Sequence, residues 1–133
     1  MAELPELSGP SVAPASGGKA EQVVMFVHGL GADGNDLIGL APHYRHVLPD
    51  AFFVSPDAPY PYDMAPIGRQ WFPIGDFSAE SRLAGVVAAA PILDAFIDET
   101  LAAHGLGADR LLLVGFSQGT MMALHVGLRR ANQ

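Results

Sequence analysis

The feature that most constrains the fold is an apolar run, RLLLVGF (110–116), that leads through a glycine-flanked serine into a helix-like segment. Such a run of aliphatic residues is typical of a strand in a parallel sheet that is buried on both faces. The glycines on either side of Ser117 suit a turn so tight that the strand and helix backbones leave no room for a Cβ. The stretch predicts a buried strand, a sharp turn at Ser117, and a helix from about Gln118 to Arg130.

Two more strand-like runs precede it, QVVMFVHG (22–29) and AFFVSPDAP (51–59). Apolar residues at helical spacing follow each run, over residues 35–48 and over residues 80–104. Strand and helix therefore alternate three times, which is the signature of a parallel α/β sheet. We expect an α/β fold, a three-layer α/β/α sandwich with a mostly parallel sheet.

Prolines and glycines predict where these elements are interrupted. Pro42 should shift the start of the first helix or kink it, and Pro91 should kink the long helix or divide it in two. Gly105 is well placed as a left-handed stop after that helix. Residues 57–79 hold many turn residues and aromatics without a clear period, so a long loop is expected there.

Composition limits the domain organisation and the possible partners. With 133 residues, half of them hydrophobic, the chain supports one compact core, preceded by an extended arm over residues 1–20 with one short edge strand near SGPSVAP. A formal charge of −7 lacks the basic footprint of a protein that binds nucleic acid or an anionic membrane. The absence of cysteine fits a reducing, cytoplasmic location, and neither a secretory signal nor a membrane span is evident.

The turn GFSQG (115–119) fits the pattern G-x-S-x-G, in which a serine hydroxyl is lifted above the carboxyl edge of a sheet. The helix that follows presents free backbone N–H groups, so the N–H of Gln118 is placed to stabilise an oxyanion formed at Ser117. The glycine turn after the first strand would lend a second N–H, from Leu30. The pattern predicts a serine nucleophile with its oxyanion hole.

A rival interpretation rests on HGLGADG (28–34), which also satisfies the dinucleotide fingerprint through Gly29, Gly31 and Gly34. Asp57, near the end of the second strand, would then stand in for the ribose-binding acid. The acidic residues Asp33 and Asp36 would repel a pyrophosphate there, so we favour the hydrolase and keep the dinucleotide module as an alternative.

The histidines of the first half suggest structural roles. His28, at a strand end before a tight turn, is better explained as a hydrogen-bonding partner of the loop than as a catalytic base. His43 and His46 lie three residues apart on a helix without a third metal ligand. No residue pattern demands a metal or a cofactor.

Four motifs together, VVMFVHGLGADGNDL, SPDAPYP, RQWFPI and RLLLVGFSQG, resemble the phospholipase/carboxylesterase group of α/β-hydrolases, which includes acyl-protein thioesterases. The likeness runs from about residue 21 to residue 130, with the motifs in family order. The resemblance implies that residues 21–133 form the N-terminal portion of an α/β-hydrolase domain, a truncated form of that fold.

The resemblance also implies roles for single residues and a substrate class. The substrate would be a small acyl ester or thioester, or a lysophospholipid, hydrolysed through an acyl-enzyme. The implied residues are the nucleophile Ser117, the oxyanion donors Leu30 and Gln118, and the substrate contacts Trp71 and Phe72, with Met64 as a weaker candidate.

The activating groups of a triad are missing from this sequence. In α/β-hydrolases the acid and then the histidine follow the serine, but the sixteen residues after Ser117 include no acid and only His125. Eight residues along the same helix correspond to about 12 Å, which is beyond hydrogen-bond reach. We therefore expect a fragment that is inactive alone, or one with only an assembly or binding role.

That expectation has a structural counterpart. If the sheet stops at the strand over residues 110–116, this strand has an unpaired apolar edge. We expect self-association, or a partner chain that covers the edge.

Overall fold

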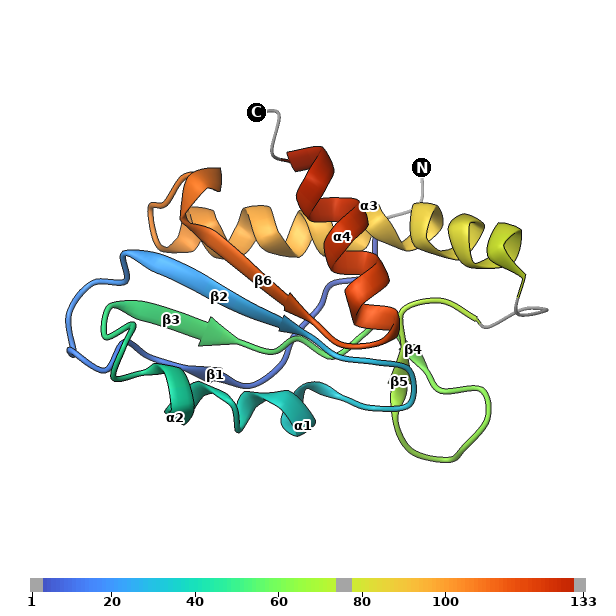
Figure 1. Ribbon diagram of the computed structural model, residues 1–133, viewed down its shortest axis with the longest axis horizontal. Helices are drawn as coiled ribbons and strands as arrows, with labels where there is room; N and C mark the ends of the chain where they lie inside the picture. Colours follow the sequence, from blue (N-terminus) through green and yellow to red (C-terminus); the bar gives the residue numbers. More distant parts are fainter. Residues whose placement is uncertain (1–3, 74–77, 131–133) are drawn as a thin grey trace.

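The computed structural model describes residues 4–73 and 78–130 and contains a four-stranded sheet with helices on both faces (Figure 1). Two parallel pairings, β3 with β2 and β2 with β6, form its centre, and β1 joins the other side of β3 in the antiparallel sense. In spatial order the strands are β1 (Ser11–Val12), β3 (Ala51–Val54), β2 (Gln22–Val27) and β6 (Leu111–Gly115). The strand expected in the N-terminal arm is therefore present.

The helices form the two outer layers, with α1 and α2 below the sheet in Figure 1 and α3 and α4 above it. They are α1 (Gly34–Ile38), α2 (Ala41–Tyr44), α3 (Ala79–Ala103), a 3₁₀ turn η1 (Ala108–Arg110) and α4 (Gln118–Arg130). None of the helices that the structure describes has both the length and the apolar character to cross a membrane.

The central strand β2 explains why two helical layers form. Its side chains alternate, so that Val24 and Phe26 join the core beneath α1 and α2 while Val23, Met25 and Val27 join the core beneath α3 and α4. All five residues are at most 2% exposed. A strand buried on both faces must be apolar at every position, which is the pattern seen in the sequence. The predicted α/β/α sandwich is confirmed.

The segment after β2 forms two short helices instead of one. Gly39 ends α1, and its N–H bonds to the carbonyl of Leu37. Pro42 occupies the first turn of α2, where a missing N–H leaves no helical bond unmade. The proline therefore starts a new helix within the range 35–48 expected to be one.

Pro91 does not divide α3, which continues through it as a single helix of 25 residues. Val86 and Ala90 before the proline, and Leu93 and Ile97 after it, anchor the helix in the core. Pro91 itself is exposed, and so is Val87, whose carbonyl loses its helical donor. Water can satisfy that carbonyl, so the proline is tolerated.

The end of α3 follows the predicted stop. Gly105 has a φ of +67°, and its N–H bonds to the carbonyl of Ala102. The N–H of Leu106 bonds to the carbonyl of Leu101, which completes a Schellman motif.

The long loop expected over residues 57–79 contains a small antiparallel hairpin that the sequence did not reveal. Its strands are β4 (Tyr60–Pro61) and β5 (Arg69–Gln70). Strands of two residues are too short to show a period. Backbone hydrogen bonds join Arg69 to both Gly31 and Ala32, so the hairpin is fixed to the turn after β2.

β6 is less buried than its apolar sequence predicts. Among the described strands it pairs only with β2, and Leu112 is 52% exposed. On α4, which packs against β6, Leu124 and Leu128 are also more than half exposed. The unpaired apolar edge is as expected, but burial of this strand on both faces is not observed among the described residues.

Candidate active site

Ser117 stands at the turn between β6 and α4 in a backbone conformation that serine rarely adopts. Its φ is +54°, and within residues 4–73 and 78–130 it is the only non-glycine residue with a positive φ. The left-handed conformation costs an ordinary L-residue about 1–2 kcal/mol. Hydrogen bonds across the turn hold it there, from Gly119 N–H to Phe116 and from Thr120 N–H to the carbonyl of Ser117. The serine itself is exposed.

The flanking glycines are required by close backbone contacts, as the sequence predicted. A Cβ on Gly119 would overlap the carbonyl oxygen of Val27 and lie 2.5 Å from that of His28. A Cβ on Gly115 would lie 2.6 Å from the carbonyl oxygen of Gly119. The start of α4 therefore sits directly against the end of β2.

The two expected oxyanion donors come from segments that meet at Ser117. A Cβ on Gly29 would lie 3.0 Å from the Cβ of Ser117, so the turn carrying Leu30 lies against the serine. Gln118 is the first residue of α4. Within the described part of the chain, neither the Leu30 N–H nor the Gln118 N–H has a hydrogen-bond acceptor. Both N–H groups are therefore free to donate to a group placed beside the exposed Ser117 hydroxyl.

His28 is fully buried and both of its ring nitrogens are engaged. Nδ1 lies 2.7 Å from the carbonyl oxygen of Gly29, and Nε2 accepts a hydrogen bond of 2.9 Å from the N–H of Ala58. Burial lowers the pKa of His28, although the Gly29 carbonyl and the carboxylates of Asp57, Asp33 and Asp36 oppose this effect. The neutral ring holds two loops together, which confirms the structural interpretation.

Asp57 caps α1. Its carboxylate accepts a 2.7 Å hydrogen bond from the N–H of Gly34, while Asp33 and Asp36 form a capping box at the same helix end. A dinucleotide pyrophosphate would need this helix terminus for itself. Three carboxylates gathered there disfavour the dinucleotide alternative.

Trp71 is fully buried and is fixed by hydrogen bonds at both its side chain and its backbone. The indole N–H donates to the carbonyl of His28 at 2.9 Å. The backbone N–H of Trp71 donates to Oε1 of Gln118 at 2.8 Å, and Nε2 of Gln118 donates to the carbonyl of Phe72 at 2.9 Å. Sequence reasoning assigned Gln118 only a backbone role, since no local pattern links residues 47 positions apart.

A pocket of about 510 Å³ lies between the β4–β5 hairpin and α3. Trp71 and Phe72 form part of its wall, whereas Met64 is 71% exposed and does not line it. The described residues that line it are Tyr60, Pro61, Asp63, Gln70, Trp71, Phe72, Pro73, Gly85, Ala88 and Ala89. Ser117 is outside this set, and Gln118 connects the two through its bonds to the pocket wall.

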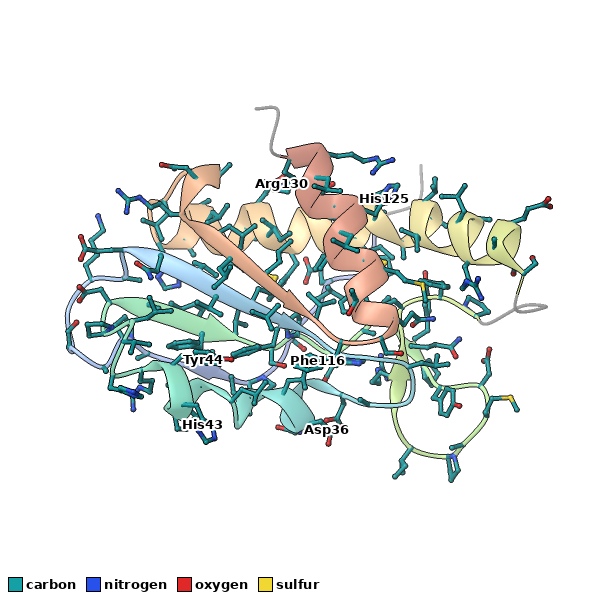
Figure 2. All side chains as sticks on the ribbon, in the orientation of Figure 1. Asp36, His43, Tyr44, Phe116, His125 and Arg130 are labelled. Atoms are coloured by element: carbon teal, nitrogen blue, oxygen red, sulfur yellow. The ribbon has the colours of Figure 1, made fainter. Side chains whose placement is uncertain are left out.

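No histidine or carboxylate of the described residues is hydrogen-bonded to Ser117. His125 lies further along α4, toward Arg130 and away from Phe116, which marks the turn in Figure 2. Burial and the nearby Arg129 guanidinium lower the pKa of His125, while Asp94 opposes them. Among the described residues, the Ser117 hydroxyl beside the two free N–H groups therefore has no proton acceptor bonded to it.

Comparison with known proteins identifies relatives of this arrangement. The family model described as Phospholipase/Carboxylesterase matches residues 9–133. Esterase YpfH of Escherichia coli strain K12 is 31% identical over 105 residues, which cover 79% of this chain. The crystal structure of esterase PE8 superimposes with a TM-score of 0.87, at 46% identity over 93% of this chain.

Two further structures share the fold. A carboxylesterase from Mesorhizobium loti has a TM-score of 0.60 at 25% identity over 93% of this chain. A phospholipase/carboxylesterase from Dyadobacter fermentans has a TM-score of 0.62 at 20% identity over 96% of this chain. The chain covers 45% of YpfH, 58% of PE8 and 56% of each of the other two, about half the length of these relatives.

Proposed function

The chain belongs to the phospholipase/carboxylesterase family of α/β-hydrolases, and from this premise we propose that it supplies the nucleophile and the oxyanion hole of a serine carboxylesterase. The observation that carries the proposal is the left-handed Ser117, exposed at the carboxyl edge of the sheet beside two unbonded N–H groups. Strain of this kind persists where the surrounding structure enforces it and is concentrated at functional sites.

In the proposed reaction Oγ of Ser117 attacks the carbonyl carbon of an ester or thioester and loses its proton to a base. The N–H groups of Leu30 and Gln118 stabilise the negative charge on the former carbonyl oxygen. The tetrahedral intermediate collapses, the alcohol or thiol leaves with a proton, and an acyl group stays on Ser117. Water then attacks the acyl-enzyme and releases the carboxylic acid.

The base and its orienting acid belong, in this proposal, to residues outside 1–133. Support comes from His28, whose ring nitrogens are both engaged, and from His125, which lies eight positions along α4. Without a base a triad enzyme loses up to about 10⁶ in turnover. The 133-residue chain alone should therefore hydrolyse p-nitrophenyl esters up to about 10⁶-fold more slowly than the protein extended to the length of its relatives, and rapid turnover by this chain would refute this part of the proposal.

For the substrate we propose an acyl ester or thioester, with lysophospholipids included. We propose that the enzyme is cytoplasmic. The apolar wall formed by Trp71 and Phe72 suits an acyl chain, and Met64 stands at the exposed margin of the same loop.

A fluorophosphonate probe tests the nucleophile directly. In the protein extended to the length of its relatives, the probe should label Ser117, and Ser117→Ala should abolish labelling. Thr120→Ala, an exposed hydroxyl three residues further along, is the matched control and should label like the wild type. Labelling that survives in Ser117→Ala would overturn the assignment.

A further inference from the structure

We infer that the side chain of Gln118 is a positioning residue that ties the wall of the apolar pocket to the turn carrying Ser117. The inference rests on the proposed function and deepens it, because it concerns how that site selects an acyl chain. It goes beyond the backbone N–H of Gln118, which is the part of this residue that the proposed chemistry uses.

The side-chain amide of Gln118 hydrogen-bonds to backbone groups in the way that the backbone of a neighbouring strand would. Its amide accepts from the N–H of Trp71 at 2.8 Å and donates to the carbonyl of Phe72 at 2.9 Å, and the residue is only 4% exposed. The segment 71–72 lies beyond the end of β5, so these two backbone groups take their partners from a side chain. Without the amide, a buried donor and a buried acceptor would both be left unpaired, which is unfavourable in a site that excludes water.

One residue thereby couples two parts of the site. The backbone N–H of Gln118 faces the proposed oxyanion, while its side chain fixes the pocket wall. The indole of Trp71 also bonds to the carbonyl of His28, one residue before the turn that carries Leu30. These bonds fix the position of Trp71 relative to both proposed oxyanion donors. A long acyl chain bound along the pocket wall is thereby aligned with Ser117.

Only a group with both a donor and an acceptor can replace the amide. An ionised glutamate at position 118 would lack the donor and would place negative charge against the carbonyl of Phe72. A protonated glutamate regains a donor and an acceptor. Methionine has a similar shape and neither strong group. These three states separate hydrogen bonding from packing.

Trp71 is the only tryptophan in the chain, so its fluorescence reports this contact without any catalytic activity. In Gln118→Met we expect a red-shifted emission maximum and stronger acrylamide quenching than in the wild type. In Gln118→Glu the same change should appear at pH 8 and reverse at pH 5. The control Gln22→Glu, at the start of β2, should match the wild type at both pH values.

The outcome that overturns the inference is an unchanged Trp71 emission in Gln118→Met and in Gln118→Glu at pH 8. If Gln118→Met does not fold, as judged by circular dichroism, the pH-reversible change within folded Gln118→Glu still decides the matter. Absence of that change would likewise reject the inference.

Kinetics in the protein extended to the length of its relatives test the selectivity. We expect Gln118→Met to lower the ratio of kcat/KM for p-nitrophenyl octanoate to that for the acetate by about tenfold, mainly through KM. An equal loss on both esters would contradict a positioning role. If wild-type Ser117 is not labelled by fluorophosphonate, the proposed function fails, whereas the fluorescence result on Trp71 stands independently.

Discussion

β2 and β6 are neighbouring parallel strands, and each ends in a glycine-containing turn that leads into a helix. Residues 23–27 of β2 are almost completely buried, and the turn after it is held by the doubly bonded ring of His28. β6 lies at the sheet edge with Leu112 half exposed, and the turn after it holds Ser117 in a left-handed conformation. Among the described residues, the first turn has both ring nitrogens of His28 paired and leaves the Leu30 N–H free, while the second turn leaves the Gln118 N–H free beside the exposed Ser117.

The difference shows how this small α/β unit divides its tasks. The central turn contributes rigidity, because hydrogen bonds join His28 to Ala58 and to Trp71, which lie in two other segments. The edge turn holds Ser117 in a strained backbone conformation, which lowers the stability of the fold. The strained turn depends on the rigid one, since Gly119 sits against the carbonyls of Val27 and His28.

The largest effect is expected where the two turns touch. Gly119→Ala should lower the free energy of unfolding by about 3 kcal/mol or more, because the new Cβ overlaps the Val27 carbonyl. The control Gly127→Ala lies on the same helix and would meet only Leu113, at 3.4 Å. It should be neutral or stabilise by up to about 1 kcal/mol. Urea unfolding followed by Trp71 fluorescence measures the change in unfolding free energy for both variants. Equal changes would show that the Ser117 turn does not depend on its contact with the turn after β2.

The contrast between a central and an edge strand predicts self-association of the 133-residue chain through β6. Leu112→Lys should weaken association by about tenfold or more, or about 1.4 kcal/mol, since a charged residue on an open edge opposes strand pairing. Leu83→Lys, on an equally exposed apolar position of α3, is the control. Sedimentation velocity over a concentration series gives the association constant. A wild-type chain that stays monomeric would show that the open edge has no such consequence.

The paired turn should make stability depend on pH. Burial lowers the pKa of His28 below the ordinary histidine value of about 6.5, so the unfolded chain binds more protons than the folded one under acidic conditions. The contribution of His28 is therefore complete above about pH 6.5 and decreases as the pH falls toward its folded pKa. The fall in unfolding free energy below pH 6.5 should be shallower in His28→Gln, whereas His46→Gln, at an exposed position, should keep the wild-type slope.

The smallest effect concerns the strain itself. Ser117→Gly should be more stable than Ser117→Ala by about 1 kcal/mol, because glycine adopts a positive φ without a steric penalty and alanine does not. Neither variant has a hydroxyl, so the difference between them isolates the free energy of holding residue 117 at a positive φ. Equal urea midpoints for the two variants would indicate that the turn stores no strain.

The sequence was a good guide wherever one segment carried the whole signal. The apolar run of β2, the glycines around Ser117 and the left-handed stop at Gly105 each have a local physical cause, and each was predicted. The open edge of β6 was also expected, but its predicted burial on both faces was not observed among the described residues, because the residues that cover the faces of a strand lie elsewhere in the chain. The hairpin that holds Arg69 was missed because its strands of two residues are too short to show a period.

The predicted site was informative about backbone groups and less so about side chains. Leu30 and Gln118 meet at Ser117 because they follow neighbouring parallel strands, whose carboxyl ends share one edge of the sheet. The amide bridge from Gln118 to Trp71 depends on tertiary packing between segments 47 residues apart, which no period or motif encodes. The substrate contacts Trp71, Phe72 and Met64 stay predictions.

The open flank of β6 also bears on the colloidal behaviour of this chain. At neutral pH a formal charge of −7 keeps copies apart by mutual repulsion. As acidification protonates the carboxylates and histidines, that repulsion decreases, while the edge of β6 that has no partner strand among the described residues remains available. Solubility should therefore be lowest in mildly acidic, concentrated solutions, and preparations are best kept dilute at neutral or slightly alkaline pH.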